Sequence, residues 1–324
     1  MTPQRTTMHR TLILTLLSLA LASAACDRAR APGSTPAAHY AAVEVDAMQD
    51  TIRLSAPARR VISLAPNITE MLFAIGAQDL MVGRTTYCNY PPAATRIEPV
   101  ADIQQLNYEK IIALKPDLLP MTFVGNMKTS YNKLKELGLR PFLLHDSTIG
   151  EVIQGFEVLG ALVGRTEAGE AVAGRLRRTV DSIRTLAGND SVTVFVVIDR
   201  APLMTVSGGF IAEMLSTAGG RNIAHGGVTQ YPTFSREELL RRDPEVIIVP
   251  GPDWQGVSDL LNTYPEWHRL RAVRNNRVYV LPSDVIERPG PRIGIGLELL
   301  YRALHGAEPH RLFEEAQHLA EDPT

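Results

Sequence analysis

Residues 107–119 read NYEKIIALKPDLL, and residues 235–247 read SREELLRRDPEVI. The two segments align without a gap at a separation of 128 positions. Each begins with a residue suited to a helix N-cap, Asn107 or Ser235, whose side chain can accept a hydrogen bond from a free helical amide. Each continues to a proline, which cannot donate the next helical hydrogen bond, and then to an apolar run. Both segments therefore predict the same unit, a short helix followed by a buried strand.

A second repeat has a different separation. The tripeptide EML occurs at 70–72 and again at 213–215, which are 143 positions apart. Each copy lies in a predicted helix that follows a strand-forming apolar run, at 60–65 in one half and at 192–198 in the other. Strands that alternate with helices favour a parallel sheet. The sequence therefore predicts an α/β fold of two Rossmann-like lobes with mostly parallel sheets.

The segment 166–186 lies between the two halves and predicts one long connecting helix. Its apolar residues recur at helical spacing, at Val172, Leu176, Val180 and Ile183. A helix of this length spans about 31 Å, enough to join two lobes. Gly169 and Gly174 each disfavour a helix by about 1 kcal/mol relative to alanine. A helical connection is stiffer than a coil hinge, so we expect only a small closure of the lobes.

The N-terminus predicts export. Two arginines precede an apolar run at 11–22, which is shorter than the ~20 residues of a spanning helix and ends in small residues. This pattern is typical of a signal peptide. The sequence LASAAC at 21–26 resembles a bacterial lipobox, in which Cys26 becomes the lipidated first residue. Cleavage after Ala24 without lipidation is the alternative.

These patterns together predict five parts of the chain. They are a signal peptide over 1–25, a lipid-anchored flexible tether over 26–42, an N-terminal α/β lobe over 43–164, a linking helix over 165–188 and a C-terminal α/β lobe over 189–324.

Composition excludes several classes of protein. The 33 Lys and Arg residues nearly balance 35 Asp and Glu residues, which disfavours nucleic-acid binding. Two cysteines and scattered histidines cannot form a disulfide framework or a four-thiolate zinc site. Neither a Gly-x-Ser-x-Gly nucleophile motif nor a phosphate-binding P-loop is present. An α/β enzyme that uses Cys88 remains an alternative of another class.

Five segments, in this order and spacing, resemble one known family. They read RVISLAPNITE at 60–70, VGRTTYCNYPP at 82–92, IALKPDL at 112–118, AGGRNIA at 218–224 and RVYV at 277–280. The chain resembles the periplasmic substrate-binding proteins of ABC importers whose lobes are joined by a single helix, and is most similar to their cobalamin-binding branch. The resemblance implies a monomeric binding protein without enzymatic activity or catalytic cofactor. It would capture a corrinoid between its lobes and deliver it to a permease dimer with its ATPase subunits; haem or a ferric siderophore is the alternative cargo.

The resemblance also implies a ligand site. Tyr87 and Tyr231 match positions that contact the cargo ring in cobalamin binders, and their aromatic faces suit a flat macrocycle. Ile103, Thr122 and Ile198 stand where aromatics are expected, with Phe123 as a substitute for the second. Three further residues match polar positions of the family's cleft: Asp284, Glu287 and Arg288. Loop anchoring by the tyrosines and a surface pair between Arg288 and Glu287 are the alternatives.

Glu109 and Glu237 occupy the same second position of the two repeated helices. In the resembling proteins, a glutamate at this place on each lobe docks into arginine pockets of the permease. Two solvated acids at helix starts are the alternative. Ser235 and Glu238 are spaced for a capping box. The expected location is the periplasm, as a membrane-anchored lipoprotein or as a soluble protein.

Overall fold

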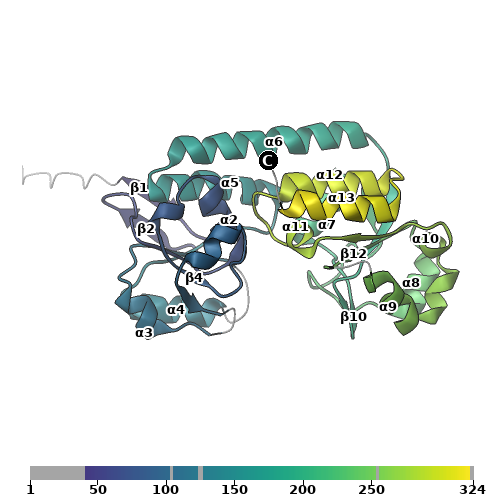
Figure 1. Ribbon diagram of the computed structural model, residues 1–324, viewed down its shortest axis with the longest axis horizontal. Coiled ribbons are helices and arrows are strands. Elements are labelled where there is room, and N and C mark those ends of the chain that lie inside the picture. The colour runs from purple at the N-terminus through teal and green to yellow at the C-terminus, as the bar shows by residue number, and fades with distance from the viewer. Residues whose placement is uncertain (1–40, 103–104, 123–126, 253–254, 322–324) are drawn as a thin grey trace, which may run out of the picture. The chain divides into compact units, whose positions relative to one another are not determined.

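The computed structural model describes residues 41–102, 105–122, 127–252 and 255–321 (Figure 1). The predicted signal peptide and Cys26, together with Ile103 and Phe123, lie outside the described residues. Residues 41–324 form one compact unit. Within the described ranges, no helix has the length and apolar character needed to cross a bilayer.

A parallel sheet forms the N-terminal lobe. β3 (Val61–Ser63) pairs with β4 (Met81–Thr85), which pairs with β5 (Pro99–Ala101). On its other edge, β3 meets β6 (Leu119–Met121) through a parallel bridge between Val61 and Leu118, and β6 pairs with β7 (Pro141–Leu143). The strand order is therefore β5-β4-β3-β6-β7. The accompanying elements are the hairpin β1 (Ala42–Val45) and β2 (Thr51–Leu54), the helices α2 (Pro66–Ala74), α3 (Tyr108–Ala113), α4 (Met127–Glu136) and α5 (Ile149–Val163), and the 3₁₀ turns η1 (Gln78–Leu80) and η2 (Pro92–Arg96).

A second parallel sheet forms the C-terminal lobe. Its order is β11 (Gly220–Asn222), β8 (Val192–Val196), β12 (Val246–Pro250) and β13 (Val278–Leu281). The accompanying elements are β9 (Asp199–Arg200), β10 (Leu203–Met204), α7 (Gly209–Thr217), α8 (Arg236–Arg242), α9 (Gln255–Thr263), η3 (Pro265–Arg269), α10 (Arg271–Arg274), α11 (Ser283–Ile286), α12 (Ile293–Leu304) and α13 (Pro309–Glu321).

The two lobes repeat one topology. The order β4-β3-β6-β7 in the first lobe corresponds to β11-β8-β12-β13 in the second. Helix α7 begins and ends 143 positions after α2, and α8 begins 128 positions after α3, which are the separations found in the sequence. The predicted fold of two α/β lobes with parallel sheets is confirmed.

One helix connects the lobes. α6 (Thr166–Ala187) has 22 residues and runs along the top of both lobes in Figure 1. Gly169 disfavours a helix by its intrinsic propensity, but its position in α6 is explained by packing. A Cβ at this position would lie 2.4 Å from the carbonyl oxygen of Phe156 in α5. The absence of a side chain therefore lets α5 and α6 pack closely.

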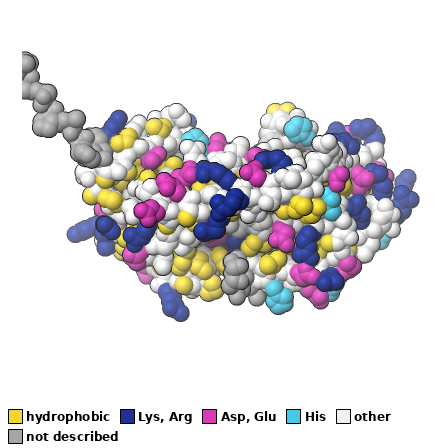
Figure 2. All heavy atoms as spheres, turned by 90° about the horizontal axis from the view of Figure 1, so that it is seen from above, with side chains coloured by type: hydrophobic (Ala, Val, Ile, Leu, Met, Phe, Trp, Pro, Cys, Tyr) yellow, Lys and Arg dark blue, Asp and Glu magenta, His cyan; other side chains and the backbone are white. Residues whose placement is uncertain are grey.

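One apolar core continues across the lobes. It includes Leu72 and Phe156 of the first lobe, Val172 of α6, and Met214 and Leu297 of the second lobe, each at most 5% exposed. Because these residues belong to one cluster, the lobes are joined by packing as well as by the helix. Figure 2 shows the face seen from above, where acidic and basic side chains are interspersed.

Candidate functional site

A cavity of about 460 Å³ lies between the two sheets. It receives residues from loops that follow β3, β4, β6 and β7 in the first lobe, and from the second lobe. The carboxyl ends of parallel strands are where α/β proteins place their ligand sites. The lining residues include Leu64, Asn67, Tyr87, Thr122 and Asp146 on one side, and Phe210, Gln230, Tyr231, Glu287, Arg288 and Pro289 on the other.

The duplication builds part of this cavity. Asn67 in the first turn of α2 and Phe210 in the first turn of α7 both line it, and they are 143 positions apart. Asp146 before α5 and Pro289 before α12 also line it, at the same separation. Corresponding positions of the two repeats therefore face one cavity.

Both tyrosines singled out in the sequence line the cavity. Tyr87 is 53% exposed and Tyr231 is 41% exposed, although both are large apolar side chains. The Tyr231 loop is held by the backbone, because the amide of Ser207 donates to the carbonyl of Gln230 at 2.9 Å. Burial and the nearby Glu287 and Asp146 charges raise the pKa of Tyr231. Two half-exposed rings, one from each lobe, are thus available to a bound molecule.

Arg288 reaches the cavity wall from the loop that follows α11. Its guanidinium lies 2.8 Å from the Asp284 carboxylate and 3.2 Å from Glu70, and it donates to Asn89 Oδ1 at 3.0 Å. Arg288 is therefore held by partners other than its sequence neighbour Glu287. Asp284 does not line the cavity, so it can affect a bound ligand only through Arg288.

The other two described positions where the resemblance implies aromatics differ in location. Ile198 is packed at the edge of the core and does not line the cavity. Thr122 does line it and is buried.

Two cavity acids have strongly raised pKa values. Burial raises the pKa of Glu287 to about 7, and the neighbouring Asp284 charge adds to the rise. Burial, reinforced by Glu151, raises the pKa of Asp146 to about 6. Part of the Glu287 surface is open to solvent, and the rest is enclosed at the wall of the cavity. Near neutral pH these acids can hold protons, and each can then donate a hydrogen bond.

These raised pKa values predict a pH-dependent stability. Between pH ~4.5 and ~7 the folded protein holds a proton on Glu287 that the unfolded chain has lost, so stability falls as the pH rises. We expect Glu287→Gln to leave stability unchanged near pH 4.5 and to raise it by about 1 kcal/mol at pH 8, allowing for solvent exposure. Urea unfolding at pH 4.5, 6 and 8 measures the difference. An unaltered pH slope contradicts the assignment, and Glu170→Gln on the exposed face of α6 is the control.

The helices that carry Glu109 and Glu237 match the prediction closely. Asn107 Oδ1 accepts from the Lys110 amide at 2.9 Å, and Ser235 Oγ accepts from the Glu238 amide at 3.1 Å. Both glutamates are exposed, and α3 and α8 lie on the side of the molecule away from α6 (Figure 1).

The reciprocal half of the predicted capping box does not form. The Glu238 carboxylate pairs instead with Arg241 and Arg242, one turn further along α8, because residues three and four apart share a helix face. These arginines lower the pKa of Glu238 to about 2.

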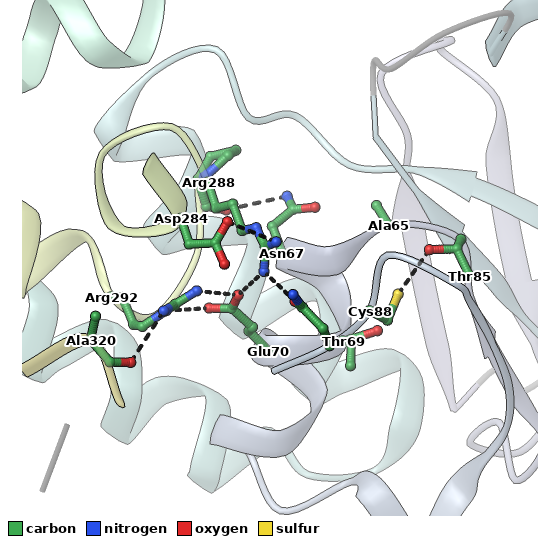
Figure 3. A network of polar contacts seen from close by, with 12 residues as sticks. Ala65, Asn67, Thr69, Glu70, Thr85, Cys88, Asp284, Arg288, Arg292 and Ala320 are labelled. Atoms are coloured by element: carbon green, nitrogen blue, oxygen red, sulfur yellow. Dashed lines mark hydrogen bonds and ion pairs between the residues drawn. The ribbon is translucent and has the colours of Figure 1, made fainter. Parts of the chain in front are cut away.

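Cys88 is fully buried and lies outside the cavity lining. Its thiol is 3.2 Å from Thr85 Oγ1 (Figure 3). The described residues include no cluster of three or more groups suited to a metal ion. The thiol therefore has a packing role in the β4 loop and no access to a ligand in this cavity.

The buried contact between Glu70 and Arg292 is not predicted by the spacing of residues in the sequence. Arg292 Nε donates to Glu70 Oε2 at 2.9 Å, and Arg292 Nη2 donates to Glu70 Oε1 at 2.7 Å (Figure 3). The Glu70 side chain is 1% exposed and that of Arg292 is 4% exposed. The available sequence signal was the repeated EML tripeptide, which places Glu70 and Glu213 at the same position of two predicted helices.

A family model described as "Periplasmic binding protein" matches residues 61–285. The chain belongs to the periplasmic binding protein family. The resemblance stated from the sequence is confirmed by this match and by curated relatives. A protein named "Vitamin B12-binding protein" from Vibrio cholerae is 34% identical over 245 residues, which cover 73% of this chain and 85% of the relative. One of the same name from Photorhabdus laumondii is 34% identical over 249 residues, covering 76% and 88%.

Solved structures of periplasmic binding proteins share the fold. The periplasmic vitamin B12 binding protein of Vibrio cholerae has a TM-score of 0.70 and 32% identity, covering 77% of this chain and 97% of that one. A periplasmic heme binding protein from Pseudomonas aeruginosa has a TM-score of 0.68 and 25% identity, covering 78% and 94%. The periplasmic binding protein described here thus shares its two-lobed architecture with carriers of different cargoes.

Proposed function

We propose that this periplasmic binding protein captures a corrinoid in the cavity between its lobes and delivers it to the permease of an ABC importer. The observation that carries the proposal is the cavity itself, with Tyr87 of one lobe and Tyr231 of the other on its walls. The names of the curated relatives support the choice of a corrinoid. The function is binding, with no bond made or broken.

The cavity chemistry suits a corrinoid. Half-exposed tyrosine rings can cover the apolar faces of a macrocycle at little cost in side-chain freedom. A corrinoid also carries peripheral amides and, in complete cobalamins, a phosphate. The Arg288 guanidinium can donate to amide or phosphate oxygens, and a protonated Glu287 can donate to an amide carbonyl. Haem or a ferric siderophore is the second candidate, because Thr122 stands at the cavity wall where an aromatic is expected.

Delivery involves the permease and the membrane. We propose that Glu109 and Glu237 dock the two lobes onto the two permease subunits, since a symmetric partner requires matching groups at corresponding positions. Lipidation of Cys26 would anchor the mature monomer in the periplasm by the tether that follows it. Removal of the leader without lipidation would give a soluble periplasmic protein.

A titration tests the cargo. We expect the purified protein to bind cyanocobalamin with a change in visible absorbance, and to bind haem and a ferric hydroxamate siderophore more weakly by at least tenfold. The double variant Tyr87→Ala/Tyr231→Ala should lose on the order of a hundredfold in cobalamin affinity, about 2.7 kcal/mol, since it removes two large aromatic contacts. Calorimetry measures the cobalamin affinity of the wild type and of the double variant.

The matched control is Tyr301→Ala, which removes a half-buried tyrosine of α12 outside the cavity. It should leave cobalamin affinity unchanged. Tighter binding of haem than of every corrinoid tested would overturn the corrinoid assignment in favour of the second candidate.

A further inference from the structure

The Glu70 carboxylate joins the two lobes. It belongs to α2 of the first lobe, and both of its cationic partners, Arg292 and Arg288, belong to the second. The contact with Arg292 is bidentate, a geometry that fixes orientation as well as distance. Figure 3 shows the two guanidiniums converging on this one carboxylate.

The duplicated position makes a contact in the opposite direction. Glu213 of α7, in the second lobe, accepts from the backbone amide of Ile149 in the first lobe at 2.6 Å. Ile149 begins α5, and Arg292 immediately precedes α12. Glu213 follows Glu70 by 143 positions, and Arg292 follows Ile149 by the same number. The two contacts are therefore copies of one arrangement, in which the first helix of each lobe reaches the start of a helix in the other lobe.

We propose that these copies are paired inter-lobe latches that fix how the lobes meet and thereby hold Arg288 at the cavity wall. The Glu70 latch consists of Glu70, Arg292 and Arg288, and the Glu213 latch consists of Glu213 and the Ile149 amide. Each latch lies one helical turn from a cavity residue, since Asn67 precedes Glu70 by three positions and Phe210 precedes Glu213 by three. Each latch is therefore placed to affect the position of a cavity residue on its own helix.

Neighbouring contacts tie the Glu70 latch to the ligand loops. Arg288 also donates to Asn89, which follows Tyr87 by two residues. The Arg292 guanidinium lies over the Tyr90 ring, 4.2 Å from its centroid. Asn67 Nδ2 donates to the carbonyl of Pro289 at 3.3 Å. One polar network thus positions cavity residues from both lobes.

The two latches differ in strength. The Glu70 latch joins a buried carboxylate to two cations, whereas the Glu213 latch joins a half-buried carboxylate to one neutral amide. Both carboxylates accept charge-assisted hydrogen bonds, but Glu70 accepts three from the two arginines, whereas Glu213 accepts one from the Ile149 amide. The Glu70 latch is therefore the dominant one.

Amide exchange of the full chain, without ligand, tests the latches. Glu70→Gln keeps the side-chain shape and removes the charge. We expect faster exchange together in 66–74 and in 283–293, by at least tenfold, with 246–250 in β12 unchanged. Glu213→Gln should produce a smaller increase confined to 149–152 and 209–217. Unchanged exchange in the paired segments, or a uniform increase throughout the chain, would overturn the proposal.

A measurement of cyanocobalamin binding tests the positioning of Arg288. Unlike amide exchange, this test rests on the proposed function. Glu70→Gln should weaken cyanocobalamin binding on the order of tenfold in the wild-type background and have no further effect in an Arg288→Gln background. Equal losses in both backgrounds would refute positioning through Arg288. If the wild type binds no corrinoid, the proposed function fails. The latches are then still tested by amide exchange in 283–293, the segment that contains Arg288.

Discussion

The double variant Glu109→Lys/Glu237→Lys is expected to abolish cobalamin uptake while leaving cobalamin affinity unchanged. Both carboxylates are exposed at the start of repeated helices, α3 and α8, and neither lines the cavity. Reversal of both charges would place lysines against the proposed arginine pockets of the permease, and like charges in contact cost several kcal/mol. Uptake into proteoliposomes containing the permease and its ATPase measures the loss, and calorimetry measures the affinity.

A second pair of exposed glutamates provides the control. Glu170 of α6 and Glu298 of α12 are also exposed, and α6 lies on the side of the molecule away from α3 and α8 (Figure 1). Their reversal to lysine changes the net charge equally and should leave uptake intact. Loss of cobalamin binding in the Glu109→Lys/Glu237→Lys variant, or normal uptake by it, would remove the docking role.

Arg292→Met should lower the free energy of unfolding by about 3 kcal/mol, because it leaves the buried Glu70 carboxylate with Arg288 alone. For a chain of this size the melting temperature should fall by roughly 5 °C. Denaturant unfolding and calorimetry give both values. The double variant Glu70→Leu/Arg292→Met should recover at least half of the loss, since apolar replacement removes both desolvated charges.

The control for this prediction is a solvent-exposed pair with the same bidentate geometry. Arg177 of α6 donates to Glu157 of α5 at 2.8 and 2.9 Å, with side chains 51% and 33% exposed. Arg177→Met should cost less than about 1 kcal/mol, as exposed pairs do. Equal effects of the two methionine variants would show that burial of the Glu70 pair is not what stabilises the fold.

Local chemistry explains why the fold could be predicted. The caps at Asn107 and Ser235, and the prolines that follow their helices, act within a few residues and need no knowledge of the rest of the chain. The connecting helix was predicted over 166–186 and spans Thr166–Ala187. The prediction for Gly169 included only its intrinsic helix propensity. It could not include the close packing against Phe156, which belongs to the neighbouring helix α5.

The site depended on contacts that sequence spacing does not reveal. Glu70 and Arg292 are 222 positions apart, and each alone reads as an ordinary charged residue. The raised pKa of Glu287 likewise arises from how the surrounding chain encloses it. Tyr87, Tyr231 and Arg288 were found because they match a family pattern, and their roles in binding remain predictions.

One apolar cluster contains residues of α6 and of both copies of the repeat. Leu72 of the first lobe and Met214 of the second both belong to this cluster. Separating the two copies would therefore expose apolar surface that is buried in the whole chain.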